Sequence, residues 1–519
     1  MRFRAANVKA LFSILLLGAG MYCAQAQLII SNNLLSVNFN QASGQFFATN
    51  FASGRTFISQ GSFNETSGPA AIVTVSNATF GVGQEIQFAH PDGNSDAIML
   101  FSNVPFAFFQ STLTNGSSQT VISNHIHTLT ALVDLDEPVG NLKAIGTGGL
   151  TTPSANPGSY AWLAVADPQS RNGVVGAWLT SDRGSGIVFG KVNGSLVQMD
   201  AQLDYGRLQF LPGQTNALEI FALGYFDDAR VGLETWADEI AQVYNIHLPP
   251  QPDGLCTYPM NQNGGASSPA AVAQLTDFVK TNLEPFGFDM IQIDAGWQGG
   301  ITSTNGSNHG PTRVFTEYTN AYSAGVKPTA DYMATNGITP GIWFEPFAGT
   351  SDDPYFTNHE DWFVETTNGT PYWCEWGGNS LDMTYQPARN YVSNMVSNIS
   401  QNWDYTYFKM DGFWTGTATP LEYVNSSYVD DHMGDAVFSN PAKPNIEAFR
   451  DGIKLVREAA GTNVFFDGCN IAQNMRSYSG SFGLLDAMRV GPDNSASWSG
   501  WQRSTQYGSR HYFLQGRVW

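Results

Sequence analysis

Charged residues are scarce in this sequence, and basic residues are the scarcer kind. Only 13% of the 519 residues are charged, and 24 Lys and Arg stand against 44 Asp and Glu, which gives a net charge of −20. A chain with this balance has little positive charge to neutralise phosphates, so we expect no nucleic-acid partner. An anionic membrane surface is disfavoured for the same reason. A neutral partner such as a sugar fits the composition better.

Cysteine is also rare, with four residues in the whole chain. Cys23 lies near the N-terminus, and the other three (Cys256, Cys374 and Cys469) are widely spaced and odd in number. They indicate no disulfide framework, and no Cys-x-x-Cys pair or His/Cys cluster has the spacing of a metal site. We therefore expect no metal, no cofactor, at most one disulfide bond and at least one free thiol.

A short apolar run near the N-terminus, over residues 10–20, follows three basic residues within the first nine positions. Ala24-Gln25-Ala26 supplies the small residues of a cleavage site. The run is shorter than the about 20 residues that a membrane-spanning helix needs, and no later segment resembles one. The sequence predicts a cleavable signal peptide over residues 1–26 and a secreted or periplasmic protein without a membrane partner.

Residues 27–225 have the pattern of short β-strands. Some segments alternate apolar and polar residues, as Leu35–Phe39 does, and others are short apolar runs, as Ile72–Val75 is. Turns rich in Gly, Asn and Ser separate them. The pattern predicts a large antiparallel β-sandwich. Residues 226–250 then combine helical spacing with a Pro-rich end, which predicts a linker and a domain boundary.

Residues 251–519 alternate between apolar strands and helices, which is typical of a parallel sheet covered on both faces. We predict strands at 255–258, 290–294, 339–345, 406–411, 464–467 and 487–490, and helices at 269–283, 318–336, 387–402, 446–460 and from 504 onward. A (β/α)8 barrel needs two more strands, so we expect an incomplete TIM-type barrel and a chain truncated at its C-terminus. An open or shortened barrel is the alternative, but it would expose strand edges.

Polar groups follow the C-terminal ends of these strands, where barrel enzymes carry their catalytic residues. They are Asp294, Glu345, Asp411, Asp467, Arg489 and Asp493. Glycosidic cleavage needs two carboxyl groups, one to attack the anomeric carbon and one to protonate the leaving oxygen. Any single one of these Asp residues could instead cap a helix or order a turn.

Asp411 stands out because Lys409 interrupts the apolar run of its strand. A nearby ammonium keeps a carboxylate ionised, as a nucleophile requires. Asp493 follows a Gly-Pro turn just beyond a strand, which would place it above the barrel mouth with Arg489 below it. The pair Asp411 and Asp493 is therefore the predicted catalytic pair.

Four motifs in this half of the chain resemble those of glycoside hydrolase family 36, the α-galactosidase family of the clan that also holds family 27. They occur in the family's order, at Gln292–Gln298, Gly337–Pro346, Tyr407–Asp411 and Asp486–Asp493. The resemblance implies that Asp411 is the nucleophile and Asp493 the acid/base. It further implies a set of sugar-binding residues: Asp294, Trp297, Trp343, Glu345, Lys409, Cys469 and Arg489.

Three positions near the implied sugar pocket depart from the family pattern. Ala295 stands where the family usually has a second Asp, Asn470 begins a segment without the expected glycines, and Tyr258 stands near the place of a Trp. The leading hypothesis is a retaining α-galactosidase acting on an oligosaccharide or glycoside. The alternatives are an α-N-acetylgalactosaminidase, a raffinose-synthase-like galactosyl transferase, or a degenerate carbohydrate-binding protein. Oligomerisation is left open.

Overall fold

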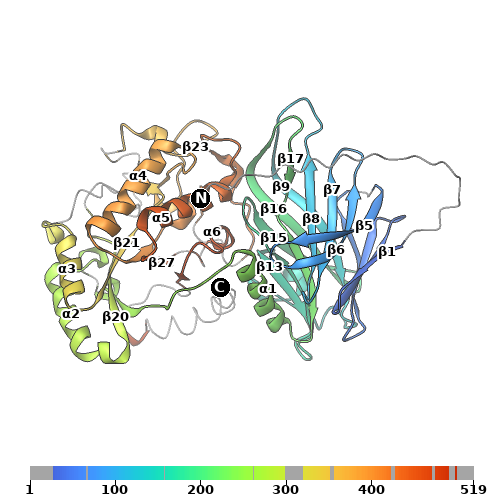
Figure 1. Cartoon of the computed structure of the whole chain (residues 1–519), viewed down its shortest axis with the longest axis horizontal. Coiled ribbons are helices and arrows are strands. Elements are labelled where there is room, and N and C mark those ends of the chain that lie inside the picture. Colours follow the sequence, from blue (N-terminus) through green and yellow to red (C-terminus); the bar gives the residue numbers. More distant parts are fainter. Residues whose placement is uncertain are drawn as a thin grey trace.

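The computed structural model describes residues 27–65, 68–156, 158–260, 262–298, 320–350, 353, 356–421, 427–469, 471, 474–489 and 497–499. The chain folds into an antiparallel β-sandwich and a parallel β/α half that lie side by side (Figure 1). The predicted signal peptide, the predicted C-terminal helix and Asp493 lie outside the described residues. No helix among the described residues is both long and apolar enough to cross a membrane.

The sandwich consists of two antiparallel sheets. The first has the order β1 (Gln27–Ser31), β2 (Leu35–Asn40), β3 (Gln45–Asn50), β4 (Thr56–Phe63), β9 (Val121–Val133), β16 (Leu196–Phe210), β15 (Ser185–Asn193), β12 (Ser159–Tyr160). The second has the order β11 (Gly149–Thr151), β10 (Lys143–Gly146), β13 (Trp162–Ala166), β14 (Gly173–Trp178), β18 (Phe221–Phe226), β8 (Ala107–Thr114), β7 (Ser95–Phe101), β6 (Gly81–Ala89), β5 (Ala70–Asn77), with β17 (Thr215–Ala217) beside β8.

Alternation along the strands builds the core between these sheets. In β2, Leu35, Val37 and Phe39 are buried, whereas the residues between them are partly exposed. Phe39 meets Phe88 of the opposite sheet with ring centroids 4.4 Å apart. The period of two therefore sends one face of each strand into a shared apolar layer, as the sequence pattern predicts.

The second half begins after helix α1 (Ala229–Val243). Its sheet is parallel throughout, with the order β19 (Asp253–Cys256), β20 (Phe288–Ile293), β21 (Thr339–Phe344), β25 (Tyr407–Met410), β27 (Phe465–Gly468), β28 (Ala487–Met488). The helices are α2 (Pro269–Asn282), α3 (Lys327–Thr335), α4 (Gln386–Ser397), α5 (Asn445–Ala460) and α6 (Met475–Gly480). Short two-stranded ribbons, β22 (Ala348–Gly349) with β24 (Asn379–Ser380) and β23 (Glu365–Thr366) with β26 (Ala436–Val437), occupy the loops.

The predicted fold class, a β-sandwich followed by an incomplete TIM-type barrel, is confirmed by this architecture, with six strands of the barrel sheet among the described residues. Several predicted bounds differ from the structure by one or more residues, and two of the differences have a clear physical cause. The first strand ends at Cys256, because Tyr258 enters a 3-10 turn that reaches Met260. Helix α3, which was predicted to begin near residue 318, begins at Lys327. Pro328 lies in its first turn, where the N–H that proline lacks would have no helical partner.

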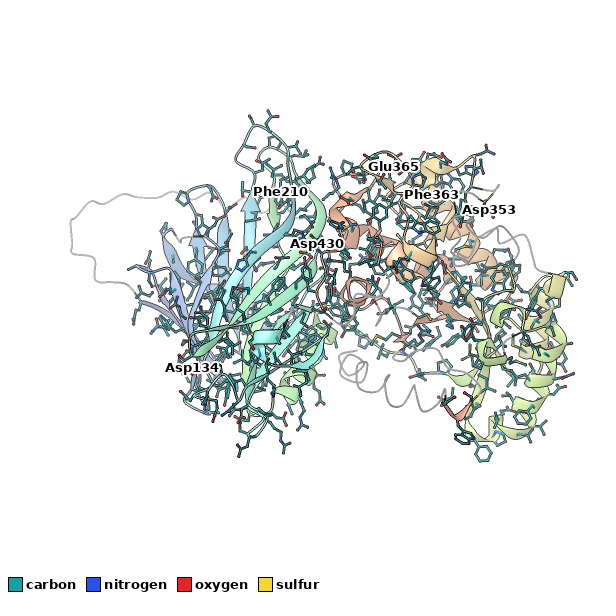
Figure 2. The ribbon with its side chains drawn as sticks, turned by 180° about the vertical axis from the view of Figure 1, so that it is seen from behind. Asp134, Phe210, Asp353, Phe363, Glu365 and Asp430 are labelled. Carbon is teal, nitrogen blue, oxygen red and sulfur yellow. The ribbon has the colours of Figure 1, made fainter. Side chains whose placement is uncertain are left out.

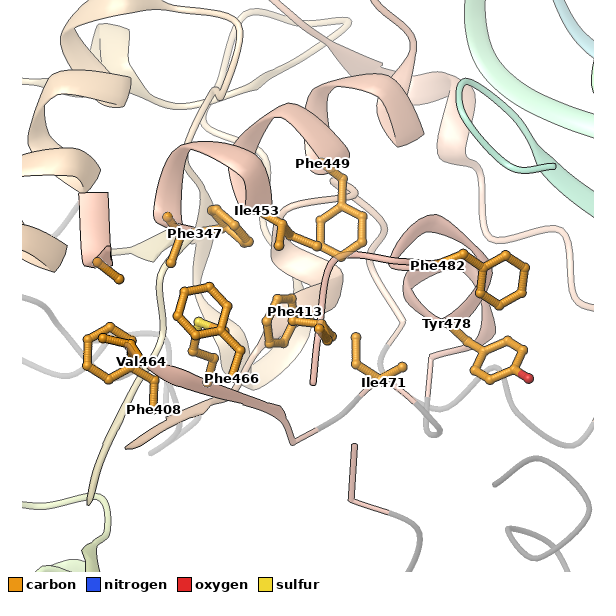
Figure 3. Packing of buried hydrophobic residues seen from close by; sticks show 14 of the residues in the cluster. Phe347, Phe408, Phe413, Phe449, Ile453, Val464, Phe466, Ile471, Tyr478 and Phe482 are labelled. Atoms are coloured by element: carbon orange, nitrogen blue, oxygen red, sulfur yellow. The ribbon is translucent and has the colours of Figure 1, made fainter. Parts of the chain in front are cut away.

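The strands of the barrel sheet send alternate side chains to opposite faces. Phe408 of β25 and Phe466 of β27 are fully buried, and their rings stack at 5.7 Å. They lie on the side that α5 covers, where Phe449 and Ile453 complete the apolar layer (Figure 3). Tyr407 and Lys409 therefore point to the other face, the interior of the barrel.

A buried ion cluster joins the two halves of the chain. Arg476 of α6 donates to Asp431 at 2.8 Å and to Asp204 of β16 at 3.0 Å, and all three side chains are buried. Asp204 also accepts from His125 of β9 at 2.7 Å. Asp430, which lies where the barrel meets the sandwich (Figure 2), is 3.7 Å from the same imidazole. The sandwich thus holds the segment that follows β25.

Candidate active site

The centre of the barrel interior is an ion pair between Lys409 of β25 and Asp294 at the end of β20. Asp294 is held by donors on both oxygens. It accepts from Lys409 Nζ at 2.7 Å, Gln292 Nε2 at 3.0 Å and Cys256 Sγ at 3.2 Å on Oδ2, and from the Ala295 backbone N–H at 2.9 Å on Oδ1. The predicted sugar-binding residues Asp294 and Lys409 are therefore in direct contact.

Both members of this pair are charged. Burial alone would raise the pKa of Asp294, but the Lys409 ammonium and the hydrogen bonds outweigh it and hold that pKa below its usual value. Burial likewise works against the Lys409 ammonium, yet the carboxylates around it, Asp294 and Asp411, raise its pKa well above the usual range. The interior thus presents a fixed ammonium beside a fixed carboxylate.

Asp411 follows directly after β25, on the same face as Lys409 two residues earlier. Its Oδ2 accepts from the indole N–H of Trp343 at 2.9 Å, and its Oδ1 accepts from the backbone N–H of Gly412 at 2.9 Å. These two donors fix the plane of the carboxylate. A carboxylate that is oriented in this way at the mouth of a barrel is suited to nucleophilic attack.

Glycine is required at position 412. Its φ is +63°, and a Cβ there would lie 2.9 Å from the carboxyl group of Glu345. The buried Glu345 side chain therefore packs directly over the turn that follows Asp411. This places Glu345 and Trp343, both predicted to bind substrate, on the β21 side of the predicted nucleophile.

Cys469, Arg489 and Asp467 approach Lys409 from the β27 side. The Cys469 backbone N–H donates to the Met410 carbonyl at 2.8 Å, and the Arg489 backbone N–H donates to the Gly468 carbonyl at 3.2 Å. Burial raises the pKa of the Cys469 thiol well above its usual value, so the group is a neutral thiol. Arg489 and Asp411 both interact electrostatically with Cys469, which places these predicted residues around one space.

Trp297 occupies a different environment from the other predicted residues. Its indole is completely buried, donates to the Trp343 carbonyl at 2.8 Å and meets Trp403 edge-on at 5.8 Å. It supports the strand that carries Trp343. Its contact with a sugar stays a prediction, as do the roles of the other site residues and that of Asp493.

Two residues at and just after the end of the first barrel strand, Cys256 and Tyr258, were not among the predicted site residues, although Tyr258 was placed near the implied sugar pocket. Cys256 ends β19 and donates its S–H to Asp294, and the Tyr258 ring centroid lies 5.8 Å from the Lys409 ammonium. The sequence contained a signal that could have selected both residues, because β19 ends at the same edge of the sheet as the strands that carry Asp294 and Asp411. Neither residue was assigned a role, because neither Cys nor Tyr is a strand-end carboxylate.

The chain is similar to known α-galactosidases. A Melibiase family model matches residues 271–427. The curated alpha-galactosidase 2 of Pediococcus pentosaceus is 25% identical over 125 residues, which is 24% of this chain and 17% of that protein. The matched segment is therefore well under two thirds of that relative's length.

Solved structures extend the likeness to nearly the whole chain. A family 36 α-galactosidase of Geobacillus stearothermophilus, in complex with 1-deoxygalactonojirimycin, gives a TM-score of 0.63 at 11% identity over 94% of this chain and 77% of that one. A variant of the same enzyme in complex with raffinose gives a TM-score of 0.64 at 12% identity, again over 94% of this chain and 77% of that one. The α-galactosidase of Lactobacillus brevis gives a TM-score of 0.60 at 12% identity, over 93% of this chain and 75% of that one. At these identities the likeness shows a shared fold.

The chain has the fold of a class of glycoside hydrolases, a β-sandwich joined to an incomplete barrel. Within that class the family model, the curated relative and the solved structures show a chain similar to the family 36 α-galactosidases. The family resemblance predicted from the four motifs is confirmed.

Proposed function

We propose that this protein is a retaining α-glycosidase, and specifically an α-galactosidase that removes terminal α-galactosyl groups from oligosaccharides or other glycosides. The observation that carries the proposal is the Asp411 carboxylate, fixed by Trp343 and Gly412 above the Lys409–Asp294 pair. The names of the similar proteins support the sugar, and the complex of one of them with raffinose supports an oligosaccharide substrate.

In this proposal Asp411 attacks the anomeric carbon while Asp493 protonates the leaving oxygen. The bond from carbon to the leaving oxygen breaks as an ester bond to Asp411 forms. Asp493, now ionised, takes a proton from water, whose oxygen attacks the same carbon and releases Asp411. Two inversions give net retention, and this requires about 5–5.5 Å between the two carboxyl groups.

Lys409 and Asp294 would bind sugar hydroxyls below the reacting carbon. Asp294 Oδ2 already accepts from three protein donors, whereas Oδ1 accepts only from the Ala295 N–H among the described residues. Oδ1 is thus the oxygen with a lone pair left for a hydroxyl. Lys409 has protons to donate besides the one that Asp294 accepts.

Ala295 favours a second candidate within the same mechanism. Its methyl group cannot accept the hydrogen bond that a carboxylate at this position would, so a sugar with a different substituent could be preferred. An α-N-acetylgalactosaminidase or a galactosyl transferase of the raffinose-synthase kind fits this difference. A panel of aryl α-glycosides, with and without an added acceptor sugar, separates these activities from α-galactoside hydrolysis.

The nucleophile is tested with Asp411→Gly and an activated aryl α-galactoside. We expect loss of turnover, and partial recovery with azide as a glycosyl azide of inverted configuration. Asp404→Gly is the matched control, because Asp404 has a φ of +61° that glycine adopts freely and its side chain is exposed. Near-normal turnover of Asp411→Gly without azide would overturn the assignment. Galactose binding without turnover in the wild type would instead indicate a carbohydrate-binding protein.

We also propose that residues 1–26 direct export and are removed, because their pattern is that of a signal peptide. Expression with and without this segment, followed by N-terminal sequencing of the exported protein, tests the proposal. A mature N-terminus at Gln27 is expected.

A further inference from the structure

The long loop between β21 and α4, over residues 345–385, carries an aromatic residue in a tight turn. The loop leaves the C-terminal end of β21, at the face of the barrel where such enzymes bind their substrates. The Cys374 backbone N–H donates to the Gly378 carbonyl at 2.8 Å and closes the turn, with Trp376 at its middle. Glu375 has a φ of +41°, which residues with a side chain rarely adopt. Such a conformation persists only where the surrounding structure fixes it, so the turn is a rigid mount for Trp376.

This turn packs against the segment that follows Asp411. Ser380, just beyond the turn, donates its hydroxyl to the Thr415 carbonyl at 2.5 Å. The Trp376 ring meets the Trp414 ring edge-on, with centroids 4.8 Å apart. Trp414 lies three residues after Asp411 and is fully buried, whereas Trp376 is only partly buried. Of these two rings, Trp376 is therefore the one that a ligand can reach.

We propose that Trp376 is a specificity-determining residue, whose ring stacks on the leaving-group sugar of an oligosaccharide substrate. The role rests on the proposed glycosidase function, in which Lys409 and Asp294 bind the terminal sugar inside the barrel. The chain leaves the barrel interior at Asp411, so Trp376 lies further toward the mouth, where the rest of the substrate must extend. The negative face of an indole attracts the C–H groups of a sugar ring, and a rigid aromatic side chain loses little entropy on binding.

Two other aromatic residues of the site lie deeper than Trp376. Trp343 donates to the Asp411 carboxylate, and the Tyr258 ring centroid is 5.8 Å from the Lys409 ammonium. Both therefore belong to the part of the site that receives the terminal sugar. The contribution of Trp376 is expected only where the leaving group is large enough to cover its ring.

Two substrates with the same galactosyl group separate this role from the chemistry. The fluoride that leaves α-galactosyl fluoride is too small to cover an indole, whereas raffinose releases sucrose. Trp376→Leu should lower kcat/KM for raffinose about tenfold relative to kcat/KM for α-galactosyl fluoride, the size of one aromatic contact. Trp376→Phe keeps a ring against Trp414 and should recover most of that loss. An equal loss on the two substrates, or a Phe variant as impaired as the Leu variant, would overturn the proposal.

Trp362→Leu is the matched control, because Trp362 is a partly buried Trp of the same loop with different neighbours. Its ring stacks on His359 at 3.9 Å and packs on Tyr391 of α4 at 5.5 Å. This variant should keep the wild-type ratio of the two kcat/KM values. A fall as large as that of Trp376→Leu would mean that any disturbance of the loop has this effect, and it would reject the specific role of Trp376.

Calorimetric titration tests the contact without turnover. In an Asp411→Asn background, which cannot form the glycosyl-enzyme, adding Trp376→Leu should weaken raffinose binding about tenfold and galactose binding much less. Absence of raffinose binding to Asp411→Asn, or an affinity that Trp376→Leu does not change, would overturn the proposal. A wild type that turns over neither substrate rejects the glycosidase, and the titration then judges the contact by itself.

Discussion

Lys409 donates to Asp294 at 2.7 Å although β21 lies between their strands in the sheet. Residues two strands apart in a sheet are separated by about 9–10 Å of backbone, and the long Lys409 side chain spans this distance to reach the Asp294 carboxylate. The ion pair therefore connects β25 to the end of β20 across the interior face of β21. It also gathers residues from distant parts of the sequence into one site.

Loss of the ammonium should damage both stability and activity. Lys409→Met leaves Asp294 buried without its main counter-charge, so we expect a loss of about 3 kcal/mol in the free energy of unfolding, together with loss of turnover. Chemical denaturation measures the first and an aryl galactoside assay the second. Lys327→Met is the control, since that ion pair is exposed and its loss should leave the denaturation midpoint unchanged. Equal midpoints for the two variants would contradict the importance of the buried pair.

The Trp343 indole should matter for turnover more than for folding. Trp343→Phe removes the donor to Asp411 and should lower kcat/KM about tenfold to a hundredfold, because a hydrogen bond to a charged group is lost. Trp236→Phe is a matched control, since its indole donates to the Trp178 carbonyl at 3.0 Å far from the barrel interior. The control should lose thermal stability but keep its kcat. An unchanged kcat/KM in Trp343→Phe would show that Asp411 is oriented by other groups.

The cluster between the halves of the chain should contribute strongly to stability. Arg476→Met leaves Asp204 and Asp431 buried without their shared cation, and we expect a loss of about 3–5 kcal/mol in the free energy of unfolding. Calorimetry should also show two separated transitions in place of one. The exposed Arg230, which pairs with Asp228, provides the control Arg230→Met. A single transition at the wild-type temperature would argue against the cluster as the link.

The same cluster should make stability depend on pH through His125. Its hydrogen bond to Asp204 is the largest cause of a pKa raised above the ordinary 6.5, with further effects of Asp430 and Arg476. Because the folded-state pKa is the higher one, this stabilisation is fully present below about pH 6.5 and is lost as pH rises through the folded value. The stability advantage of wild type over His125→Gln should therefore shrink with rising pH in denaturation curves. A constant difference would exclude the effect.

Glu239 of α1 should also lower the stability of the folded protein as pH rises, but for a different reason. Burial raises its pKa to about 7 from 4.5, so the folded chain holds a proton that the unfolded chain releases at lower pH. Wild-type stability should fall as pH rises from about 4.5 to about 7, and Glu239→Gln should lack this dependence. Thermal midpoints at both ends of that range measure the effect. Parallel curves for the two proteins would contradict it.

Much of the barrel could be predicted from the sequence, since its signals are local. A strand such as Tyr407–Met410 is short, mostly apolar and followed directly by a carboxylate, and a rule about strand ends is enough to select Asp294 and Asp411. The contact of Lys409 with Asp294 rather than with its strand neighbour Asp467 was not predictable. It depends on how far the sheet curls, which no local pattern specifies.

The link between the halves of the chain was not predicted at all. Arg476 and Asp204 are separated by 272 residues. Nothing in the sequence near either residue distinguishes a buried cation from an exposed one. Partners of this kind are defined by the packing of one domain on another, so only the folded structure reveals them.

That shared cation also bears on how such a chain can change over generations. A recombination event that replaced the sandwich with an unrelated one would leave Arg476 and Asp431 inside a junction without Asp204. Arg476 would then be buried with one of its two carboxylate partners missing. The two halves are therefore expected to be inherited together, with the junction changing only by paired substitutions.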